Sequence, residues 1–349
     1  MTVTAMERYF RPLPCAPDRA GARPLAGGWC GFAEIEALSR DEAPQVVPAD
    51  AVVSLYPEAG EVFERLVRLR APLCGTPLDR PLLMGVVNVT PDSFSDGGFL
   101  EDAYAAVRHG LALTEAGADL LDIGGESTRP GADPVPLERE LERVLPVIKG
   151  LREAGCTTPI SIDTRKAGVA AAALDAGASL FNDVSALSYD PASPDIATRA
   201  GAICLMHAQG DPRTMQDDPR YDDVLLEVYD HLAERVALAE MAGIPRARII
   251  VDPGIGFGKT IEHNLALLRG LSLFHGLGCP IMLGVSRKGF IGRLSGETDA
   301  AKRAPGSIAA ALAGLEQGVQ ILRVHDVAEH AQAIAIWKSI RDAEGETTR

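Results

Sequence analysis

Eight short apolar segments recur between residues 82 and 325, and sequence with the periodicity of an amphipathic helix follows most of them. Each segment has the length of a strand and is rich in Val, Ile and Leu. Because strands that are apolar on both faces must be covered on both faces, this alternation predicts an α/β fold closed into a (β/α)8 TIM barrel. The predicted strands are Leu82–Asn88, Asp119–Gly124, Pro159–Asp163, Leu180–Asp183, Ala202–His207, Arg248–Asp252, Pro280–Gly284 and Gln320–His325. The helices predicted most clearly are Ala103–Ala116, Leu137–Glu153, Asp222–Met241 and Ser307–Gln317.

The predicted barrel occupies residues 81–342, which leaves residues 1–80 as an N-terminal extension and residues 343–349 as a C-terminal tail. A strand at Ala51–Leu55 and a helix at Glu61–Arg68 are expected in the extension, which would then form a small α/β unit. The segment Trp29–Leu38 is apolar enough to pack on the barrel. Since the extension contains no catalytic constellation, a structural or oligomerising role is the favoured interpretation.

The charge of the chain argues against one large class of function. The net charge is −14 at pH 7 and the pI is near 5.0, and no run of five or more basic residues occurs. These properties are opposite to those of a nucleic-acid-binding protein. A phosphate group is therefore expected only in a local pocket where Arg, Lys and His side chains converge.

The cysteines and the N-terminus indicate the compartment. None of the six cysteines forms a CxxC pair, which favours buried, reduced thiols over disulfides or zinc ligands. The first residues lack a basic region followed by an apolar one, and the chain has no apolar stretch long enough to span a bilayer. We therefore expect a soluble cytoplasmic protein without a membrane partner.

Nearly every predicted strand ends in Asn, Asp, His or Arg. Asn88 ends the first strand, Asp163 the third, the pair 182–183 (Asn-Asp) the fourth and Asp252 the sixth. In a (β/α)8 barrel the carboxyl ends of the strands carry the chemistry, so the sequence predicts an enzyme. Helix capping needs fewer carboxylates than these, which favours ligand binding. The amide oxygen of Asn88 suits Mg2+ or a phosphate-bound water, although an Asn that bonds to its own turn is an open alternative.

Two polar loops follow the first two predicted strands. Residues 84–98 read MGVVNVTPDSFSDGG, and residues 122–132 read DIGGESTRPGA. Loops of this composition are typical of functional sites. Arg129 offers a planar fork for phosphate or carboxylate, but taken alone it is more easily explained as a solvated surface residue.

A glycine-rich segment follows the sixth predicted strand. Residues 254–260 read GIGFGKT, which lacks the spacing of a P-loop and of a dinucleotide-binding turn. We interpret it as a turn that lies close to a flat ligand, with Phe257 packed on an aromatic ring. His207, at the end of the fifth strand, is either a core histidine or a site residue, and the sequence leaves both possibilities open.

Basic residues gather after the last two predicted strands, in Ser286-Arg287-Lys288-Gly289 and in Arg323-Val324-His325-Asp326. The loops after strands seven and eight of such barrels often bind phosphate. Arg323 and His325 are two positions apart and are therefore expected on the same side of an extended strand. These clusters predict an anion site.

The motifs NVTPDSFSDGG, GGESTRPGA, SIDTRK, CLMHAQG, DPGIGFGK, SRKG and RVHD, in this order, closely resemble those of the dihydropteroate synthase family of folate biosynthesis. The resemblance covers about residues 82–342. It implies a transferase that condenses 6-hydroxymethyl-7,8-dihydropterin pyrophosphate with para-aminobenzoate, giving 7,8-dihydropteroate and pyrophosphate. It also implies Mg2+ as cofactor, a homodimer and inhibition by sulfonamides, which mimic aminobenzoate.

The resemblance further implies a role for individual residues. The pterin would contact Asp163, Asn182, Asp252 and Lys288. The pyrophosphate would contact Asn88, Thr128, Arg129, Arg323 and His325, with Mg2+ at Asn88. The aminobenzoate pocket would contain Phe94, Thr128, Pro130, Phe257 and Gly289. The implied catalytic residues are Asp92, Asp163 and Lys288.

Two positions depart from the pattern of many relatives: Ala208, where Met is common beside the pterin, and Gly289, where Ser often helps to hold the aminobenzoate carboxylate. Modest changes in affinity are expected from them.

One rival interpretation is a pterin-binding methyltransferase that passes a methyl group from a folate to a corrinoid protein, but such an enzyme should lack the two polar loops. A second is a non-catalytic, regulatory pterin-binding homologue, which the two departures and the extension alone support.

Overall fold

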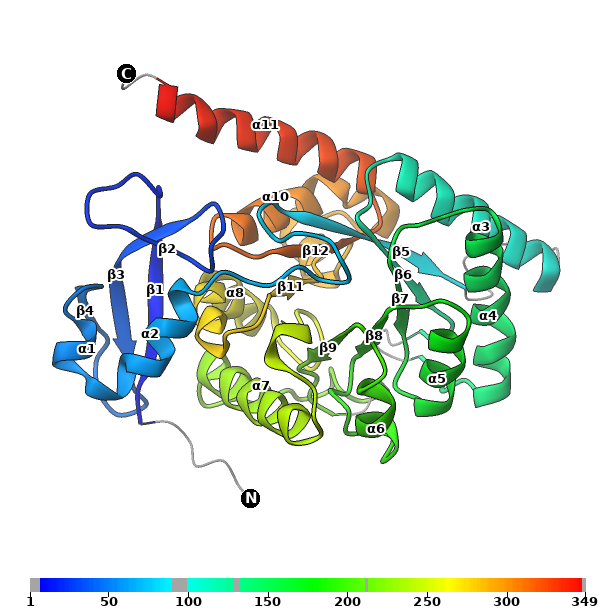
Figure 1. The fold of residues 1–349 in the computed structure, drawn as a ribbon, viewed down its shortest axis with the longest axis horizontal. Coiled ribbons are helices and arrows are strands. Elements are labelled where there is room, and N and C mark those ends of the chain that lie inside the picture. Colours follow the sequence, from blue (N-terminus) through cyan, green and yellow to red (C-terminus); the bar gives the residue numbers. More distant parts are fainter. Residues whose placement is uncertain (1–6, 90–98, 128–131, 211–212, 347–349) are drawn as a thin grey trace.

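The computed structural model describes residues 7–89, 99–127, 132–210 and 213–346. Their elements form a parallel barrel with helices around it and an antiparallel sheet at its side (Figure 1). The order of the parallel strands is β10-β9-β8-β7-β6-β5-β12-β11, and a single bridge from Val251 to Ile281 closes the ring. The predicted (β/α)8 fold is confirmed. The barrel strands are β5 (Leu82–Asn88), β6 (Leu120–Gly124), β7 (Ile160–Asp163), β8 (Leu180–Asp183), β9 (Ala202–Met206), β10 (Ile249–Asp252), β11 (Met282–Leu283) and β12 (Ile321–Val324).

Local sequence signals set the ends of the surrounding helices. The helix predicted from Asp222 begins at Val224, because the Asp223 side chain caps it by accepting from the N–H groups of Leu225 and Leu226. The helix after β10 begins with a capping box in which the Thr260 hydroxyl accepts from the N–H of His263. The helices are α3 (Phe99–Glu115), α4 (Leu137–Glu153), α5 (Ala167–Asp175), α6 (Ser193–Ala197), α7 (Val224–Met241), α8 (Ile261–Arg269), α9 (Gly289–Ser295), α10 (Ala304–Leu315) and α11 (Val327–Glu346), with 3-10 turns η2 (Arg246–Arg248), η3 (Leu271–Leu277) and η4 (Ala300–Lys302).

Two apolar cores hold the barrel together. The strand side chains that point inward, such as Leu82, Met84, Leu120 and Ile321, fill its amino-terminal half, and those that point outward pack against the helices. This alternation follows from the two-residue period of a strand. The inner core also includes Leu73 and Leu78 of the segment that enters β5, together with Leu180, Ala202, Cys204, Ile250 and Met282. Because apolar side chains occupy that half, polar chemistry is confined to the carboxyl ends of the strands.

The extension is a small α/β unit with its own core. Its antiparallel sheet has the order β1-β3-β2, with β4 paired to β3. Its buried residues include Phe10, Phe32, Ile35 and Leu66. The elements are β1 (Tyr9–Cys15), β2 (Arg23–Pro24), β3 (Gly31–Leu38), β4 (Gln45–Pro48), α1 (Val52–Leu55), η1 (Pro57–Ala59) and α2 (Gly60–Val67).

The strand predicted at Ala51–Leu55 is wrong, because residues 52–55 form the helical turn α1. Only Val52 of this turn is buried, whereas Val53 and Leu55 are exposed. A run of apolar residues this short has no period that separates a strand from a helical turn. The segment 29–38, by contrast, contributes both to the extension's core and, through Trp29, to the barrel's.

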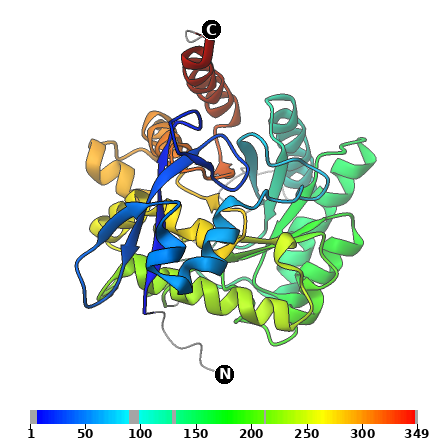
Figure 2. The ribbon, with the colours of Figure 1, turned by 60° about the vertical axis from the view of Figure 1, so that its left-hand side comes forward.

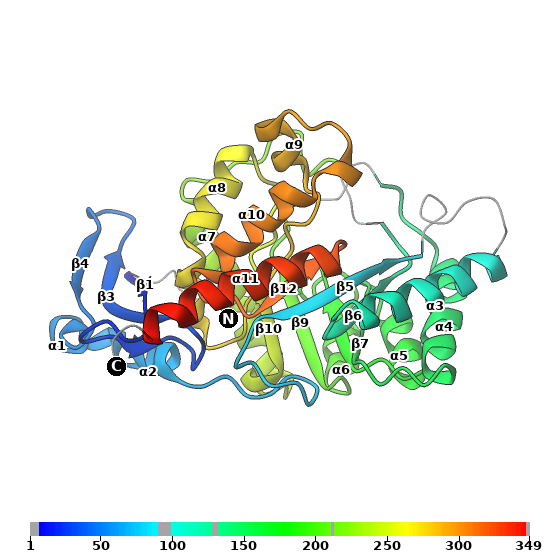
Figure 3. The ribbon, with the colours of Figure 1, turned by 90° about the horizontal axis from the view of Figure 1, so that it is seen from above.

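The extension is docked on the barrel by specific polar contacts. The Tyr9 hydroxyl donates to Asp230 on α7 (2.8 Å), and the Trp29 indole donates to the carbonyl of Leu315 (2.8 Å). Figure 2 shows the sheet laid against the barrel wall, and Figure 3 shows α11 reaching across to it. There the guanidinium of Arg341 donates to the carbonyl of Trp29 (3.2 Å). These contacts join the two units.

All six cysteines are free thiols, and four of them are buried. Among the described residues, no helix combines the length and the apolar character that crossing a bilayer requires.

Candidate active site

The register of the parallel strands brings polar side chains from neighbouring strands into one row at the carboxyl end of the barrel. Asn88 of β5 pairs with Gly124 of β6, Gly124 with Asp163 of β7, and Asp163 with Asn182 of β8. Asp252 ends β10 on the opposite side of the ring. Four of the strand-end residues predicted from the sequence therefore face the same opening, where they can contact one ligand.

Arg323 of β12 forms hydrogen bonds with carboxylates on two other barrel strands, β6 and β7. Its Nε donates to Asp122 (2.6 Å) and its Nη2 donates to Asp163 (2.8 Å), while the Asn182 amide also donates to Asp122 (3.2 Å). Burial raises the pKa of Asp163, Arg323 opposes that rise, and the Asp122 charge adds to it. Asp122 is fully buried and was missed as a site residue, although its place near the end of the second predicted strand was a usable signal.

The cluster of Asp122, Asp163 and Arg323 contains two hydrogen-bond acceptors and one donor without a partner in the described chain. Asp122 Oδ1 and Asp163 Oδ1 are buried and have no hydrogen-bond partner among the described residues. For Arg323 Nη1, too, the described part of the chain offers no partner. A buried polar atom without a partner costs about 1 to 3 kcal/mol. The arrangement is therefore suited to a ligand with N–H donors, and the guanidinium to an anionic oxygen.

Asp252 is oriented by the turn that follows it. Its Oδ1 accepts from the N–H of Gly254 (2.7 Å), and the residue is almost completely buried. Burial raises the pKa of Asp252, and the positive charges of Lys288 and Arg323 oppose that rise. Asp252 Oδ2 has no hydrogen-bond donor in the described regions, so this oxygen is available to a ligand.

The glycine turn after β10 lies against the end of β9. Gly254 has a φ of +67°, and a Cβ there would lie 1.8 Å from the carbonyl oxygen of His207, so only glycine fits. His207 is buried, and burial with the nearby Lys259 charge lowers its pKa to about 2. These properties favour the core histidine among the two possibilities left open by the sequence.

Phe257 and Lys288 meet at the edge of the site. The Lys288 ammonium lies 3.9 Å from the centre of the Phe257 ring, a cation–π contact. A Cβ on Gly256 would lie 3.3 Å from Lys288 Cδ, so the lysine stem rests on the glycine turn. Gly289 begins α9 directly after Lys288, and no atom lies within 4 Å of the position of its missing Cβ.

The loops after β11 and β12 are joined by two contacts. Ser286 Oγ accepts from the N–H of His325 (3.1 Å) and lies 2.9 Å from His325 Nδ1. The Arg287 guanidinium pairs with Asp326, whose Oδ2 lies 3.0 Å from Arg287 Nε. Arg287 thus neutralises a carboxylate instead of adding to the expected anion site, whereas Arg323 and His325 come from the same end of β12.

A buried ion network supports the loop after β6. The ammonium of Lys166 bridges Glu126 and Glu140, and Arg165 pairs with Glu126 (3.1 Å). Sequence reasoning missed this network, since it treated the SIDTRK motif as the setting of Asp163 alone. The signal was the pair of cations that directly follows that strand.

Other predicted residues are placed differently or not described. The carboxylate of Asp183 accepts from Ser185 N, Ser185 Oγ and Leu187 N, so it organises its own loop. The remaining predicted site residues lie outside the described residues; they are Asp92, Phe94, Thr128, Arg129 and Pro130.

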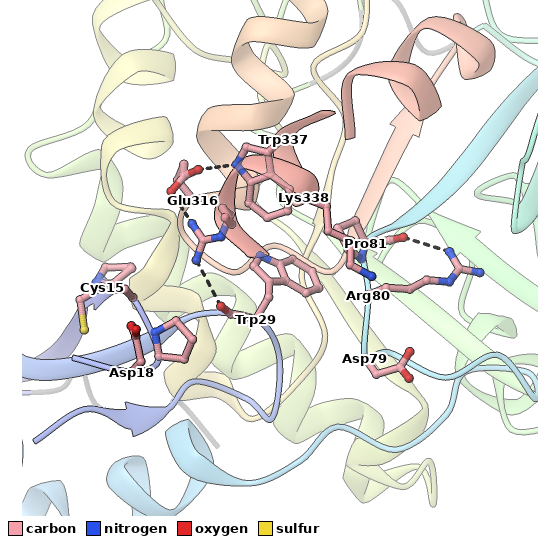
Figure 4. A pocket seen from close by; sticks show the side chains of 13 residues that line it. Cys15, Asp18, Trp29, Asp79, Arg80, Pro81, Glu316, Trp337 and Lys338 are labelled. Carbon is pink, nitrogen blue, oxygen red and sulfur yellow. Dashed lines mark hydrogen bonds and ion pairs between the residues drawn. The ribbon is translucent and has the colours of Figure 1, made fainter. Parts of the chain in front are cut away.

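A cavity of about 480 Å3 lies at the opposite end of the barrel, where the extension meets α11 (Figure 4). Its wall includes Trp29 and Trp337, whose rings meet edge to face, and Pro81, which directly precedes β5. Arg341 is held there by Glu316 (2.9 Å). The cavity is thus separate from the row of strand-end residues.

Comparisons with known proteins agree on one family. The family model described as "Pterin binding enzyme" matches residues 84–325. The dihydropteroate synthase of Neisseria meningitidis serogroup C is 49% identical over 267 residues, which cover 75% of this chain and 94% of that protein. The structure of Xanthomonas albilineans dihydropteroate synthase with 4-aminobenzoic acid is 49% identical with a TM-score of 0.73, covering 78% of this chain and 98% of that one. The complex of the same enzyme with 7,8-dihydropteroate is 47% identical with a TM-score of 0.69, covering 76% and 95%.

Proposed function

This chain belongs to the pterin-binding enzymes and, among them, to the dihydropteroate synthases, and from that premise we propose how its residues divide the reaction between them. The reaction joins 6-hydroxymethyl-7,8-dihydropterin pyrophosphate to para-aminobenzoate and releases pyrophosphate. One observation supports these roles most directly. At the mouth of the barrel, carboxylate oxygens of Asp122 and Asp163 without a hydrogen-bond partner in the described chain lie beside Arg323.

The pterin occupies the carboxylate side of the opening. Its ring presents an edge of N–H donors, which match Asp252 Oδ2 and the free oxygens of Asp122 and Asp163. Asn182 and Lys288 complete this contact, with Lys288 donating to the ring carbonyl. A ligand without these donors leaves the buried oxygens unsatisfied, so the site discriminates steeply against it.

The pyrophosphate occupies the cationic side, over Asn88, Arg323 and His325. Arg323 Nη1 is directed to a phosphate oxygen, because its other two nitrogens are held by Asp122 and Asp163. By resemblance Thr128 and Arg129 add to this contact. Bonds from a guanidinium to an anionic oxygen are among the stronger protein hydrogen bonds, so this arrangement favours departure of the leaving group.

Asn88 fits a role as a ligand of Mg2+. Its side-chain amide forms no hydrogen bond with any described residue and stands at the end of β5. No group of three or more His, Cys, Asp or Glu side chains that could hold a metal occurs among the described residues. Mg2+ keeps several water ligands and commonly binds through substrate phosphates. The ion would therefore arrive with the pyrophosphate substrate, and when bound it would neutralise charge on the leaving group.

The chemical step breaks the bond between the pterin methylene carbon and the pyrophosphate oxygen and forms a bond from that carbon to the aminobenzoate nitrogen. Positive charge develops on the methylene as the oxygen departs with the electron pair. Asp163 lies on the pterin side of the opening and stabilises that charge, while Arg323 stabilises the departing oxygen. By resemblance Asp92 assists in the same role. The nitrogen then loses one proton.

The aminobenzoate lies beside the glycine turn. Phe257 offers a ring face, Lys288 crosses it, and the N–H of Gly289 is available to the carboxylate at the start of α9. By resemblance Phe94, Thr128 and Pro130 complete the pocket. A sulfonamide presents the same aniline ring, so it competes for this pocket.

The decisive experiment supplies the purified protein with dihydropterin pyrophosphate and Mg2+, with and without para-aminobenzoate, and follows pyrophosphate and dihydropteroate together. One pyrophosphate per dihydropteroate is the expected result. Tight binding of the dihydropterin without product would instead favour a non-catalytic homologue.

Chelation with EDTA should stop product formation and added Mg2+ should restore it, whereas activity that survives EDTA would contradict the metal assignment.

Replacing Gly289 with Ser should tighten aminobenzoate binding. Apart from its chain neighbours and its own helix, no described atom lies within 4 Å of an added Cβ, so there is room for the substitution. One added hydrogen bond of about 0.5 to 1.5 kcal/mol lowers the KM for aminobenzoate roughly two- to tenfold. The KM for dihydropterin pyrophosphate, measured in the same assay, should stay unchanged. An unchanged KM for aminobenzoate would remove Gly289 from the pocket.

We also propose that the protein is a homodimer that pairs through its outer helices. Ile336 and Ile340, four residues apart on α11, are 60% and 63% exposed, and Leu294 on α9 is 58% exposed. Exposed apolar residues one turn apart on an outer helix, as on α11, are typical of an association surface. Light scattering should give twice the chain mass, and a monomer at all concentrations would contradict this.

The free cysteines support a reducing, cytoplasmic location. The extension (residues 1–80) is proposed to be structural.

A further inference from the structure

Lys259 ends the glycine turn and is buried without an acidic partner. Its side chain is almost inaccessible, and none of the hydrogen-bond partners of its ammonium in the described chain is a carboxylate. Its Nζ instead lies 2.9 Å from the carbonyl oxygen of Gly254 and 3.0 Å from that of Phe257. The Nδ1 of His207 lies 2.9 Å away. Nζ also donates to the carbonyl oxygen of His207 (3.3 Å). Burying a cation is costly, so a buried lysine that bonds to the glycine turn and to the end of β9, with no carboxylate among these partners, requires an explanation.

The conformation of the turn explains why it requires an internal donor. Gly254, Gly256 and Gly258 all have positive φ, and a Cβ on Gly258 would lie 2.4 Å from the carbonyl oxygen of Gln209. A turn pressed so closely against β9 directs its carbonyls inward, where water is excluded and an unpaired acceptor is destabilising. Lys259 is the residue that reaches two of these carbonyls at once.

Other side chains hold the rest of the turn from outside. Gly256 N–H donates to Asn264 Oδ1 (2.7 Å), and Gly256 O accepts from the Gln216 amide (2.6 Å). The Tyr221 hydroxyl donates to Gly258 O (2.8 Å). The turn is thus positioned by side chains from several segments, with Lys259 at its centre.

The aminobenzoate side of the site depends on this turn through Phe257, which is part of it. Lys288, assigned to the pterin, rests its stem against Gly256, but its backbone lies outside the turn at the start of α9. Asp252 receives one hydrogen bond from the turn but is also fixed by its strand, where it pairs with Met206. Loosening the turn should therefore disturb the aminobenzoate side of the site more than the pterin side.

We propose that Lys259 is a positioning residue for aminobenzoate: its buried ammonium fixes the glycine turn and thereby places the Phe257 ring at the aminobenzoate pocket. The proposal rests on the function proposed above. It assigns Lys259 no contact with substrate.

The test compares Lys259→Met with the wild-type enzyme. Methionine keeps the apolar stem but leaves the Gly254 and Phe257 carbonyls without their donor. The KM for aminobenzoate should rise about tenfold or more, while the Kd for dihydropterin pyrophosphate changes less than about threefold. Lys259→Gln, which keeps an N–H donor, should recover part of the lost affinity. If the wild-type protein forms no dihydropteroate in the same assay, the proposed function fails. If it does and the variants behave otherwise than expected, only the role of Lys259 fails.

Two further variants separate positioning from stability. Val147→Ala on α4 removes buried volume on another side of the barrel, so it should lower the melting temperature and leave both affinities unchanged. Tyr221→Phe removes one outer bond of the turn and should raise only the KM for aminobenzoate, by a smaller factor. If both Lys259 variants fail to fold, Tyr221→Phe decides, and an unchanged KM overturns the proposal. Equal losses for both substrates in Lys259→Met, or lost stability with neither affinity changed, would also overturn it.

Discussion

Arg323→Gln should both slow catalysis strongly and destabilise the barrel. The arginine is the cation that Asp122 and Asp163 share, at 2.6 and 2.8 Å, and glutamine cannot neutralise either. Removing one member of a buried charge cluster costs about 3 to 5 kcal/mol, because the remaining charges are left unpaired. Loss of the group that stabilises the leaving oxygen should lower kcat by about 100- to 1000-fold. Urea unfolding and steady-state turnover measure the two effects.

The pH dependence of the stability loss identifies its cause. Burial already raises the pKa of Asp163 to about 7, and removing Arg323 raises it further. Below pH 7 the carboxyl of Asp163 is protonated in both proteins. Above pH 7 the wild type has released this proton and the folded variant still holds it, so the stability deficit of the variant should grow as the pH rises. A deficit that shrinks from pH 6 to pH 8 would contradict this assignment.

A second substitution and a surface control complete the test. Adding Asp163→Asn to Arg323→Gln removes the carboxyl that must stay protonated in the folded variant and should restore part of the stability above pH 7, but not the activity. Arg139→Gln breaks an exposed pair with Glu142 and should change the free energy of unfolding by less than about 0.5 kcal/mol. If Arg323→Gln behaves like Arg139→Gln, the buried cluster is not what holds this end of the barrel.

Asp252→Asn should remove pterin binding while the fold survives. Asparagine can still accept from Gly254 N–H, so the turn keeps its bond. It replaces the second carboxylate oxygen with an N–H donor that faces the donor edge of the pterin. Sites that hydrogen-bond their substrate lose about 10⁴-fold when that pairing fails, and a loss of this order is expected in kcat/KM. Because burial raises the pKa of Asp252, the neutral side chain should cost little stability.

Asp183→Asn is the matched control for this prediction. Asp183 also ends a barrel strand and is buried, but its oxygens accept from Ser185 and Leu187 of its own loop. The control should lose some stability and keep its affinity for dihydropterin pyrophosphate, measured by calorimetry. Equal loss of affinity in both variants would mean that the pterin does not distinguish the two carboxylates.

Strand positions in the barrel followed from the sequence because these strands are buried on both faces. Leu82–Asn88 and Leu180–Asp183 have the predicted bounds, and the other strands differ by one or two residues at an end. The largest difference is the strand predicted at Pro280–Gly284, which is reduced to Met282–Leu283. Pro280 has no N–H for the ladder, which explains the loss at that end.

The extension was harder to predict because its order depends on partners that are distant in the chain. β1 contains Pro12 and Pro14 and pairs with β3, joining Tyr9 to Leu38. Neither strand has the continuous apolar run of the barrel strands. They can therefore be identified as strands only from their hydrogen-bonded pairing in the folded protein. The turn at 52–55 was misassigned for the same reason, since only the packing of Val52 determines its conformation.

The sequence by itself determined the barrel and the end of it that carries the polar residues, because hydrophobic periodicity and strand-end composition are local properties of the chain. The tertiary structure alone decided which polar groups meet. Arg323 reaches Asp122 across 201 positions and Asp163 across 160, and Lys259 finds His207 across 52. A charged residue's role depends on the partners within hydrogen-bond distance after folding, and spacing along the chain does not contain that information. For this reason the contacts of Asp122, of Lys259 and of the Glu126–Lys166 pair emerged only from the folded barrel.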